Sequence, residues 1–554
     1  MKCMADQTPR RLGQVTKGSS SKGKDGLLAK DTAKQWVTGI FAFLVLCIFP
    51  LVYHDYYFDM IETKYKTFCV CVGILAVGVF LVIPVLWYQW YSKLTNERKA
   101  EEKKRFTLAA IWKSLSIPDK AILAFWLVEL ISTLTSAYPF ESFWGNEGRF
   151  SGLFLNTLYV FVYFAISRLM TFKHWYLDAF LGFSMLVCLL GITDYFKMDL
   201  LHFRDRMSEE QLQMFVSTLG NINTYTAFVA MVSAVASVLF ADAREMGRKI
   251  FYFVCMIISF FALIMGLSDN AYLALAALFG FLPLYLFKKR SGIRSYLMIV
   301  FSFLSVVQCI GWINAAFGDR VFGMDSVFNV LIHFKGLLPL LLLGWAGIAV
   351  WYYLDKKSKI GKEDTVGMLP RYLWIGVSVL AAAVVFVVLY DCNVAGNQEK
   401  YGQFANYLIF NDDWGTHRGY IWRIALENFN EFSIWHKIVG HGPDTFGIVT
   451  YMNNYEDMLM RYGEIFDNAH NEYLNFLITT GVAGLVSYVT FLVSLIIRGF
   501  KRISKNPAVA AMLFAVICYS AQAFVNLNLP IATPIMWMFL MMTMAAVRPQ
   551  EQGE

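Results

Sequence analysis

Three polar motifs follow one another near the C-terminal end of an otherwise apolar chain. Residues 416–422 read THRGYIW, residues 440–446 read GHGPDTF and residues 466–474 read FDNAHNEYL. They place a titratable imidazole, a guanidinium and a glycine-rich turn in one segment. A histidine of near-neutral pKa can take a proton from a hydroxyl group, and an arginine can bind a phosphate through two N–H groups. The motifs therefore predict proton transfer beside a bound phosphate.

His470 is the residue we expect to act as the base. It precedes an apolar run, so it lies at the depth of the membrane surface, where water and lipid head groups meet. Asn471 and Glu472 are expected to orient the ring or the substrate, and Asp467 to stabilise an imidazolium. The alternative is a histidine that caps a helix or contacts a head group, which is the commoner role of an isolated histidine.

Arg418 and Trp422 stand four residues apart on a predicted amphipathic helix over about 417–431. They therefore share one face of that helix. Arg418 could hold a phosphate through two hydrogen bonds, and Trp422 could offer a stacking surface for a sugar. The alternative is an arginine and a tryptophan that anchor the helix at the membrane interface.

Glycines and a second arginine extend the candidate site. Gly442 belongs to a tight turn that could present backbone N–H groups to an anion, although such turns occur in most loops. Arg149 stands just before an apolar run at 152–168 and could bind phosphate, or could extend to the interface as an anchoring side chain. The run Gly-Asn-Ile-Asn at 220–223 could line the site or cap a helix.

The composition is that of an integral membrane protein. Of the 554 residues, 57% are hydrophobic and only 16% are charged, against about 25% in soluble proteins. The net charge of +7 arises mainly from loops that alternate along the chain, which is the positive-inside pattern, so it does not indicate a nucleic-acid partner. Among nine cysteines only Cys392 lies near the long polar segment, so neither a disulfide framework nor a thiolate metal site is expected.

Apolar runs predict an all-α polytopic protein of roughly 12–14 transmembrane helices. The domains expected are a disordered basic cytoplasmic tail (1–34), an N-terminal bundle (35–390), a large external loop with the site (391–474), and C-terminal helices with a short cytoplasmic tail (475–554). The predicted spans are about 36–53, 67–90, 119–137, 152–168, 176–194, 221–241, 250–267, 271–287, 296–315, 336–354, 372–390, 475–497, 507–526 and 530–547.

The charge pattern places both termini in the cytoplasm and residues 391–474 outside the plasma membrane. ATP and nucleotide sugars are cytoplasmic, so an external enzyme needs a substrate that already carries its activation, as lipid-linked intermediates do. The sequence has no P-loop and no dinucleotide fingerprint, and its loop residues show no recognisable metal-ligand spacing. We expect no cofactor and no metal.

The motifs Arg-x-x-x-Trp at 418–422, Gly-x-Gly-Pro at 440–443 and His-Asn-Glu-Tyr-Leu at 470–474 occur together with Gly-Asn-Glu-Gly-Arg at 145–149 and Thr-Gly-Val-Ala-Gly at 480–484. In this order and topology, residues 120–545 resemble the O-antigen ligase / O-antigen polymerase superfamily. Asn526, Asn528 and Pro530 also resemble the last outer turn of that family.

The resemblance implies a fold like that of the C-type membrane glycosyltransferases. It implies transfer of a glycan from an undecaprenyl-pyrophosphate carrier to a hydroxyl of a glycan or lipid acceptor, without nucleotide or metal. His470 then corresponds to the proposed base, Arg418 to the arginine associated with the pyrophosphate, and Arg149 to the arginine of the early outer loop. One departure stands out, because many relatives have Ser-Arg where this chain has Ser268-Asp269-Asn270.

Two other classes of function stay open at this point. A lipid-linked oligosaccharide flippase or other transporter would suit the number of spans, but transporters gather ionisable groups near the bilayer midplane. A catalytically silent assembly scaffold is the third possibility, and the intact His470 and Arg418 weigh against it. The sequence does not distinguish a ligase from a polymerase.

Overall fold

Helix α10 (Ile222–Asp242) lies at the centre of the fold and is buried along almost its whole length. It is rich in Ala, Ser, Thr and Val, whose small side chains let neighbouring helices approach closely. It packs against α11 (Met246–Met265) and α22 (Ala508–Gln522). By contrast, α16 (Leu369–Asn393) exposes nearly all of its apolar side chains, as expected of a helix that faces lipid.

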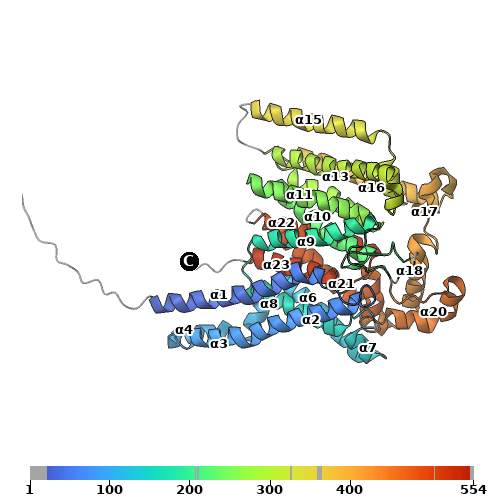
Figure 1. The fold of residues 1–554 in the computed structure, drawn as a ribbon. Coiled ribbons are helices and arrows are strands. Elements are labelled where there is room, and N and C mark those ends of the chain that lie inside the picture. The colour runs from blue at the N-terminus through green and yellow to red at the C-terminus, as the bar shows by residue number, and fades with distance from the viewer. Residues whose placement is uncertain are drawn as a thin grey trace, which may run out of the picture.

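A computed structural model describes residues 21–105, 107–146, 148–205, 207–208, 211–324, 327–357, 365–503 and 506–548. The long helices run side by side, and α17, α18 and α20 gather at one end of the bundle (Figure 1). A two-residue strand pair, β1 (Phe215–Val216) with β2 (Gly220–Asn221), precedes α10. The other α-helices are α1 (Ser21–Phe43), α2 (Met60–Val77), α3 (Ile83–Tyr91), α4 (Asn96–Arg105), α5 (Leu108–Ser114), α6 (Ile117–Thr135), α7 (Pro139–Trp144), α8 (Leu153–Leu169), α9 (Trp175–Tyr195), α12 (Ala271–Leu286), α13 (Arg290–Phe317), α14 (Val327–Ile332), α15 (Leu337–Lys357), α17 (Ala405–Leu408), α18 (Trp414–Glu431), α19 (Ile434–Val439), α20 (Phe446–Tyr462), α21 (Glu472–Phe500) and α23 (Thr533–Val547).

The prediction of an all-α polytopic membrane protein is confirmed. Within the described residues, 10 helices are long and apolar enough to cross a membrane, and α8, α12 and α23 are shorter apolar helices. Each predicted span coincides with a helix. The span expected at 119–137 is α6, which carries Asp119, Lys120 and Glu129 and does not belong to either group.

The segment 1–34, which we expected to be a disordered tail, overlaps the first helix of the structure. Helix α1 begins at Ser21, ahead of the first apolar run. Leu27, Leu28 and Ala29 are good helix formers, so the helix of the first span extends outward through this polar segment. Residues 1–20, and residues 549–554 of the expected C-terminal tail, lie outside the described residues.

A break in α21 ties this helix to the glycine-rich turn. Gly481 adopts φ 66° and ψ −173°, a conformation open almost only to glycine. The break leaves the carbonyl of Thr479 to accept the N–H of Gly442 at 2.9 Å and the hydroxyl of Ser132 at 3.2 Å. The turn at 440–443 is therefore hydrogen-bonded to α21 at its break.

Gly481→Ala should lower the free energy of unfolding by about 2–4 kcal/mol, because a Cβ adds both backbone strain and overpacking. That Cβ would lie 2.3 Å from the carbonyl oxygen of Ile438. Gly182→Ala in α9 is the control, since nothing lies within 4 Å of its added Cβ. Thermal unfolding of the detergent-solubilised variants measures the difference, and equal midpoints for both would contradict this account.

Candidate functional site

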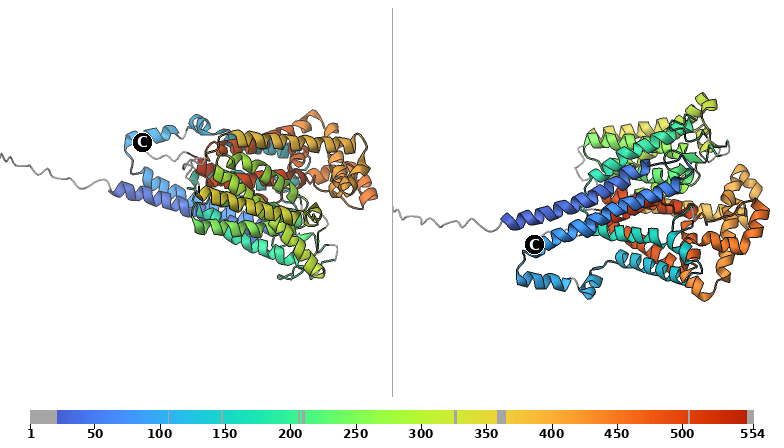
Figure 2. Two further views of the ribbon diagram at one scale, coloured as in Figure 1. Left: turned by 90° about the horizontal axis from the view of Figure 1, so that it is seen from above. Right: turned by 60° about the horizontal axis from the view of Figure 1, so that its bottom comes forward.

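Five loops from distant parts of the chain meet at the end of the bundle where α10 and α21 begin and α22 ends, which we call the site end. Figures 1 and 2 show the helices of residues 391–474 at this end, opposite the start of α1. Ser151 Oγ donates to the carbonyl of Asn528 at 3.1 Å, and Ser268 Oγ donates to Asn223 Oδ1 at 2.6 Å. Asn221 caps α10 by accepting the N–H of Asn223, so the predicted helix cap is confirmed.

The backbone around His470 is fixed by two side chains. His470 has φ 46°, and its N–H donates to Asn468 Oδ1 at 3.0 Å. The indole N–H of Trp422 donates to the carbonyl of Ala469 at 2.9 Å. Asn471 caps α21 through Oδ1, which accepts the N–H groups of Tyr473 and Leu474. The capping role once open to His470 therefore belongs to Asn471, and the imidazole stays available for chemistry.

Two cations act on the imidazole of His470. Burial lowers its pKa most, the positive charges of Arg418 and Arg149 lower it as well, and Asp467 opposes them; together these effects place the pKa at about 4. The ring is therefore neutral near pH 7 and can accept a proton. The structure thus brings together His470, Arg418 and Arg149, which are far apart in sequence.

Arg149 is already paired. Its Nε and Nη2 donate to the two carboxylate oxygens of Asp467 at 2.9 and 2.8 Å. This bidentate geometry fixes the plane of the guanidinium group. Asp467, expected to stabilise an imidazolium directly, is therefore engaged mainly with Arg149.

Asp444 holds the loop that carries Arg149, a role that the sequence analysis missed. Its Oδ2 accepts the backbone N–H of Asn146 at 2.8 Å and of Ser151 at 3.1 Å. Burial raises the pKa of Asp444 to about 7, and those two N–H groups together with Arg149 oppose the rise. A signal was present, because an aspartate directly follows Gly-His-Gly-Pro, but sequence alone does not reveal its partners.

Asp444→Ala should lower the free energy of unfolding by about 2 kcal/mol, since it leaves two half-buried N–H groups without an acceptor. Asp444→Asn keeps an oxygen acceptor and should unfold near the wild type. A carboxyl whose pKa is raised on folding stabilises the fold at low pH, and that contribution is lost as pH rises from about 4 to about 7. Thermal unfolding between pH 4 and 8 should show this slope in the wild type and a flatter one in Asp444→Asn; the same slope in both would refute the assignment.

Arg418 makes fewer hydrogen bonds than Arg149. Regular helix begins here, because Gly415, Thr416 and His417 are left-handed. One guanidinium N–H donates to the carbonyl of Gly415, whereas Nε is buried without a hydrogen-bond partner. Within the described residues, no carboxylate lies within ion-pair distance of Arg418. This leaves hydrogen-bonding capacity for an anionic substrate.

The unusual Ser-Asp-Asn turn lies beside Arg418. Burial raises the pKa of Asp269, while hydrogen bonds with the hydroxyls of Tyr272 and Tyr407 and the charge of Arg418 oppose that rise. Burial lowers the pKa of Arg418, and Asp269 opposes that change. Where many relatives have a second cation, this chain therefore has a carboxylate close to Arg418.

Two predicted substrate-binding residues point elsewhere. The carboxylate of Glu472 is buried in the bundle and accepts the hydroxyl of Tyr488 at 2.5 Å. The N–H of Gly442 is bonded to Thr479, so it is not free for an anion as expected, and a Cβ there would lie 2.0 Å from Ser142 Oγ. Both residues shape the scaffold beneath His470.

The chemistry open to these side chains is anion binding and proton transfer. Arg418 and Arg149 supply positive charge, and neutral His470 supplies a proton acceptor. Across the described residues, no three His, Cys, Asp or Glu side chains gather in a way that could hold a metal ion.

Residues 336–489 match the family model described as O-antigen ligase. This segment is similar to that family, which supports the resemblance of the chain to the O-antigen ligase / O-antigen polymerase superfamily. The match contains Arg418, Trp422, Gly442 and His470, whereas Arg149 lies before it. Among curated proteins, none matches the chain significantly.

The chain is a multi-pass membrane protein, and the match at 336–489 supports an O-antigen ligase-like role in polysaccharide biosynthesis. Its matched segment supplies His470 and Arg418. The preceding bundle supplies Arg149 through the loop that Asp444 holds. The candidate site therefore contains residues from the matched segment and from the bundle that precedes it.

Proposed function

We propose that the protein transfers a glycan from an undecaprenyl-pyrophosphate carrier to a hydroxyl of a glycan or lipid acceptor, on the outer face of the plasma membrane. One observation carries the proposal: a histidine with a pKa of about 4 lies in the field of two arginines. This arrangement suits a reaction that needs a neutral base beside a leaving group with several negative charges.

In the proposed step, the acceptor oxygen attacks the anomeric carbon of the donor sugar. A new C–O bond forms as the bond between that carbon and the pyrophosphate oxygen breaks, and the leaving pyrophosphate keeps the electron pair. The proton of the acceptor hydroxyl passes to the imidazole of His470. Arg418 stabilises the charge that grows on the pyrophosphate, which is where electrostatic catalysis has its largest effect.

The surrounding residues hold this geometry. Arg149 adds positive charge from a fixed position, because Asp467 binds it through two hydrogen bonds. Trp422 holds the carbonyl of Ala469, next to the base, so it acts as a positioning residue; its remaining aromatic face can stack on a sugar. Asn471 fixes the start of α21 directly after His470.

The placement of the basic loops supports cytoplasmic termini and an external site. The candidate site residues lie at one end of the bundle, whereas transporters gather such groups near the midplane. Purified protein in liposomes with a radiolabelled carrier-linked glycan and a soluble acceptor sugar tests the proposal. Covalent transfer to the acceptor is expected; movement of donor across the bilayer without a new bond would identify a transporter instead.

A further inference from the structure

A second polar region lies at the opposite end of the bundle from His470. A cavity of about 1310 Å³ opens where α10, α12 and α21 end and where α11, α13 and α22 begin. Each of these helices has its other end nearer to the site end. The cavity is therefore separate from the proposed transfer site.

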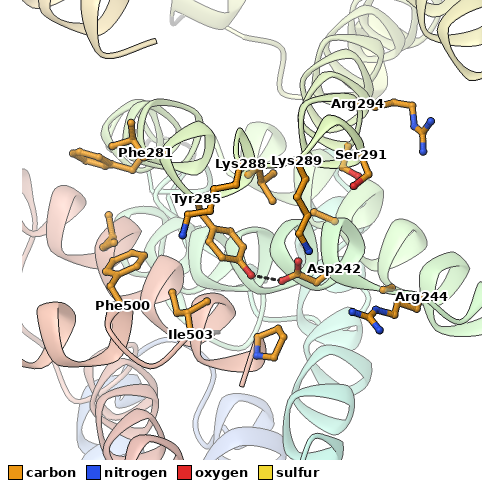
Figure 3. Close-up of a pocket in the computed structure, with 18 of the residues that line it drawn as sticks. Asp242, Arg244, Phe281, Tyr285, Lys288, Lys289, Ser291, Arg294, Phe500 and Ile503 are labelled. Atoms are coloured by element: carbon orange, nitrogen blue, oxygen red, sulfur yellow. Dashed lines mark hydrogen bonds between the residues drawn. The ribbon is translucent and has the colours of Figure 1, made fainter. Parts of the chain in front are cut away.

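The wall of this cavity is strongly basic. Asp242 is the one carboxylate among its described lining residues, and it accepts the hydroxyl of Tyr285 at 2.7 Å (Figure 3). Arg294 is also paired, with Asp355 outside the cavity at 3.0 Å. The cations that line the cavity are Arg244, Lys249, Lys288, Lys289, Arg294 and Lys501.

The positive charges oppose one another. Burial lowers the pKa of Lys288, and the neighbouring cations Arg371 and Lys289 lower it further. Like charges gathered in a partly enclosed space are costly unless an anion offsets them. The cavity is thus complementary to a ligand with more than one negative charge.

The opposite wall is apolar. Figure 3 shows Phe281, Phe500 and Ile503 across the cavity from Arg244 and Arg294. Phe281 is 51% exposed and Phe500 is 39% exposed, so these rings are open to a hydrocarbon chain. The cations lie at helix ends, which is the level of lipid head groups. A free phosphate would use the basic wall and leave the apolar wall empty.

We propose that this cavity binds the phosphate head of an anionic membrane lipid, with its hydrocarbon chain along Phe281, Leu284 and Phe500. Lys288 and Lys289 from the α12–α13 turn and Arg244 from the α10–α11 turn hold the phosphate. Basic pockets between transmembrane helices are a recurrent form of lipid recognition. This site would exist whether or not the transfer reaction at His470 is as proposed.

Equilibrium binding of a fluorescent phosphatidylglycerol to the full chain in neutral detergent tests the proposal. The double variant Lys288→Gln/Lys289→Gln should bind about thirtyfold more weakly, since each lysine near a lipid phosphate contributes roughly a factor of five. The matched control is Lys356→Gln/Lys357→Gln, which removes the same charge from the end of α15 outside the cavity. The control should change the affinity less than twofold.

Competition separates the possible ligands. Unlabelled phosphatidylglycerol should displace the probe, whereas phosphatidylcholine with the same chains and inorganic phosphate should not at equal concentration. Displacement by inorganic phosphate would replace the lipid site with a free-anion site, and an equal loss in both double variants would reduce the effect to general surface charge; either result overturns the proposal. If the double variant unfolds without lipid, Arg244→Gln alone should weaken binding about fivefold.

Discussion

His470→Gln should remove nearly all glycan transfer and leave the protein folded in the membrane. Loss of a general base lowers a rate by about 10²–10⁴-fold. The stability should hold, because within the described residues the imidazole forms no side-chain hydrogen bond. Initial rates with a carrier-linked donor, together with thermal unfolding of the same preparation, measure the two effects separately.

The pH dependence gives a second readout of the same residue. In the free protein His470 has a pKa of about 4, so kcat/KM should rise through that pH and be level near neutrality. A bound pyrophosphate offsets the charges of Arg418 and Arg149, which moves the pKa back toward its ordinary value of 6.5. The acid limb of kcat should therefore lie at higher pH than that of kcat/KM.

The control for His470 is another histidine of the same polar segment, residues 391–474. His436→Gln removes an imidazole from α19 whose ring contacts Phe432 and His441, and it should keep at least half of the activity. Activity in His470→Gln near the wild-type level, or an equal loss in both variants, would exclude His470 as the base.

The helices were predictable because their signal is local. Long apolar runs mark the spans, and even the helix over the motif at 416–422 was expected near its observed position, Trp414–Glu431. The start of that helix was not predictable in detail, because Thr416 and His417 are left-handed. Local sequence does not specify such a strained helix start.

The contacts between site residues were harder to predict than the residues themselves. Arg149 and His470 were both candidates, yet the pairing of Arg149 with Asp467 joins residues 318 positions apart. The hydrogen bond from Asn146 in the loop at 145–152 to Asp444 likewise joins residues 298 positions apart. Contacts of this kind leave no periodic pattern. A single sequence therefore shows which residues are candidates for the site, but not which of them are hydrogen-bonded to each other.

Two residues show how a motif can mislead. Gly442 has a positive φ, and such a glycine can either expose its N–H or allow close packing. Glu472 directly follows Asn471 in the motif, but the first turn of α21 directs its carboxylate into the bundle toward Tyr488. Adjacency in sequence placed Glu472 near the base, and helix geometry turned its carboxylate away, whereas the N–H of Gly442 is taken up by Thr479.

Arg418→Ala should lower kcat/KM for the carrier-linked donor by about 10²–10³-fold, the usual cost of removing one group that stabilises a developing anion. Arg149 cannot take over this role fully, because two of its nitrogens are bound to Asp467. Arg418→Lys should recover only part of the loss, since an ammonium keeps the charge but not the paired N–H groups.

Two companion variants decide whether the charge of Arg418 is what matters. Arg461→Ala removes an exposed arginine of α20 that pairs with Asp457, and it should change activity less than twofold, as surface ion pairs contribute little. Asp269→Asn removes the negative charge beside Arg418 and should act in the opposite direction, lowering KM for the donor several-fold. If Asp269→Asn raised KM instead, Asp269 would be a substrate contact, and this chain would bind its donor differently from relatives that have an arginine at the same turn.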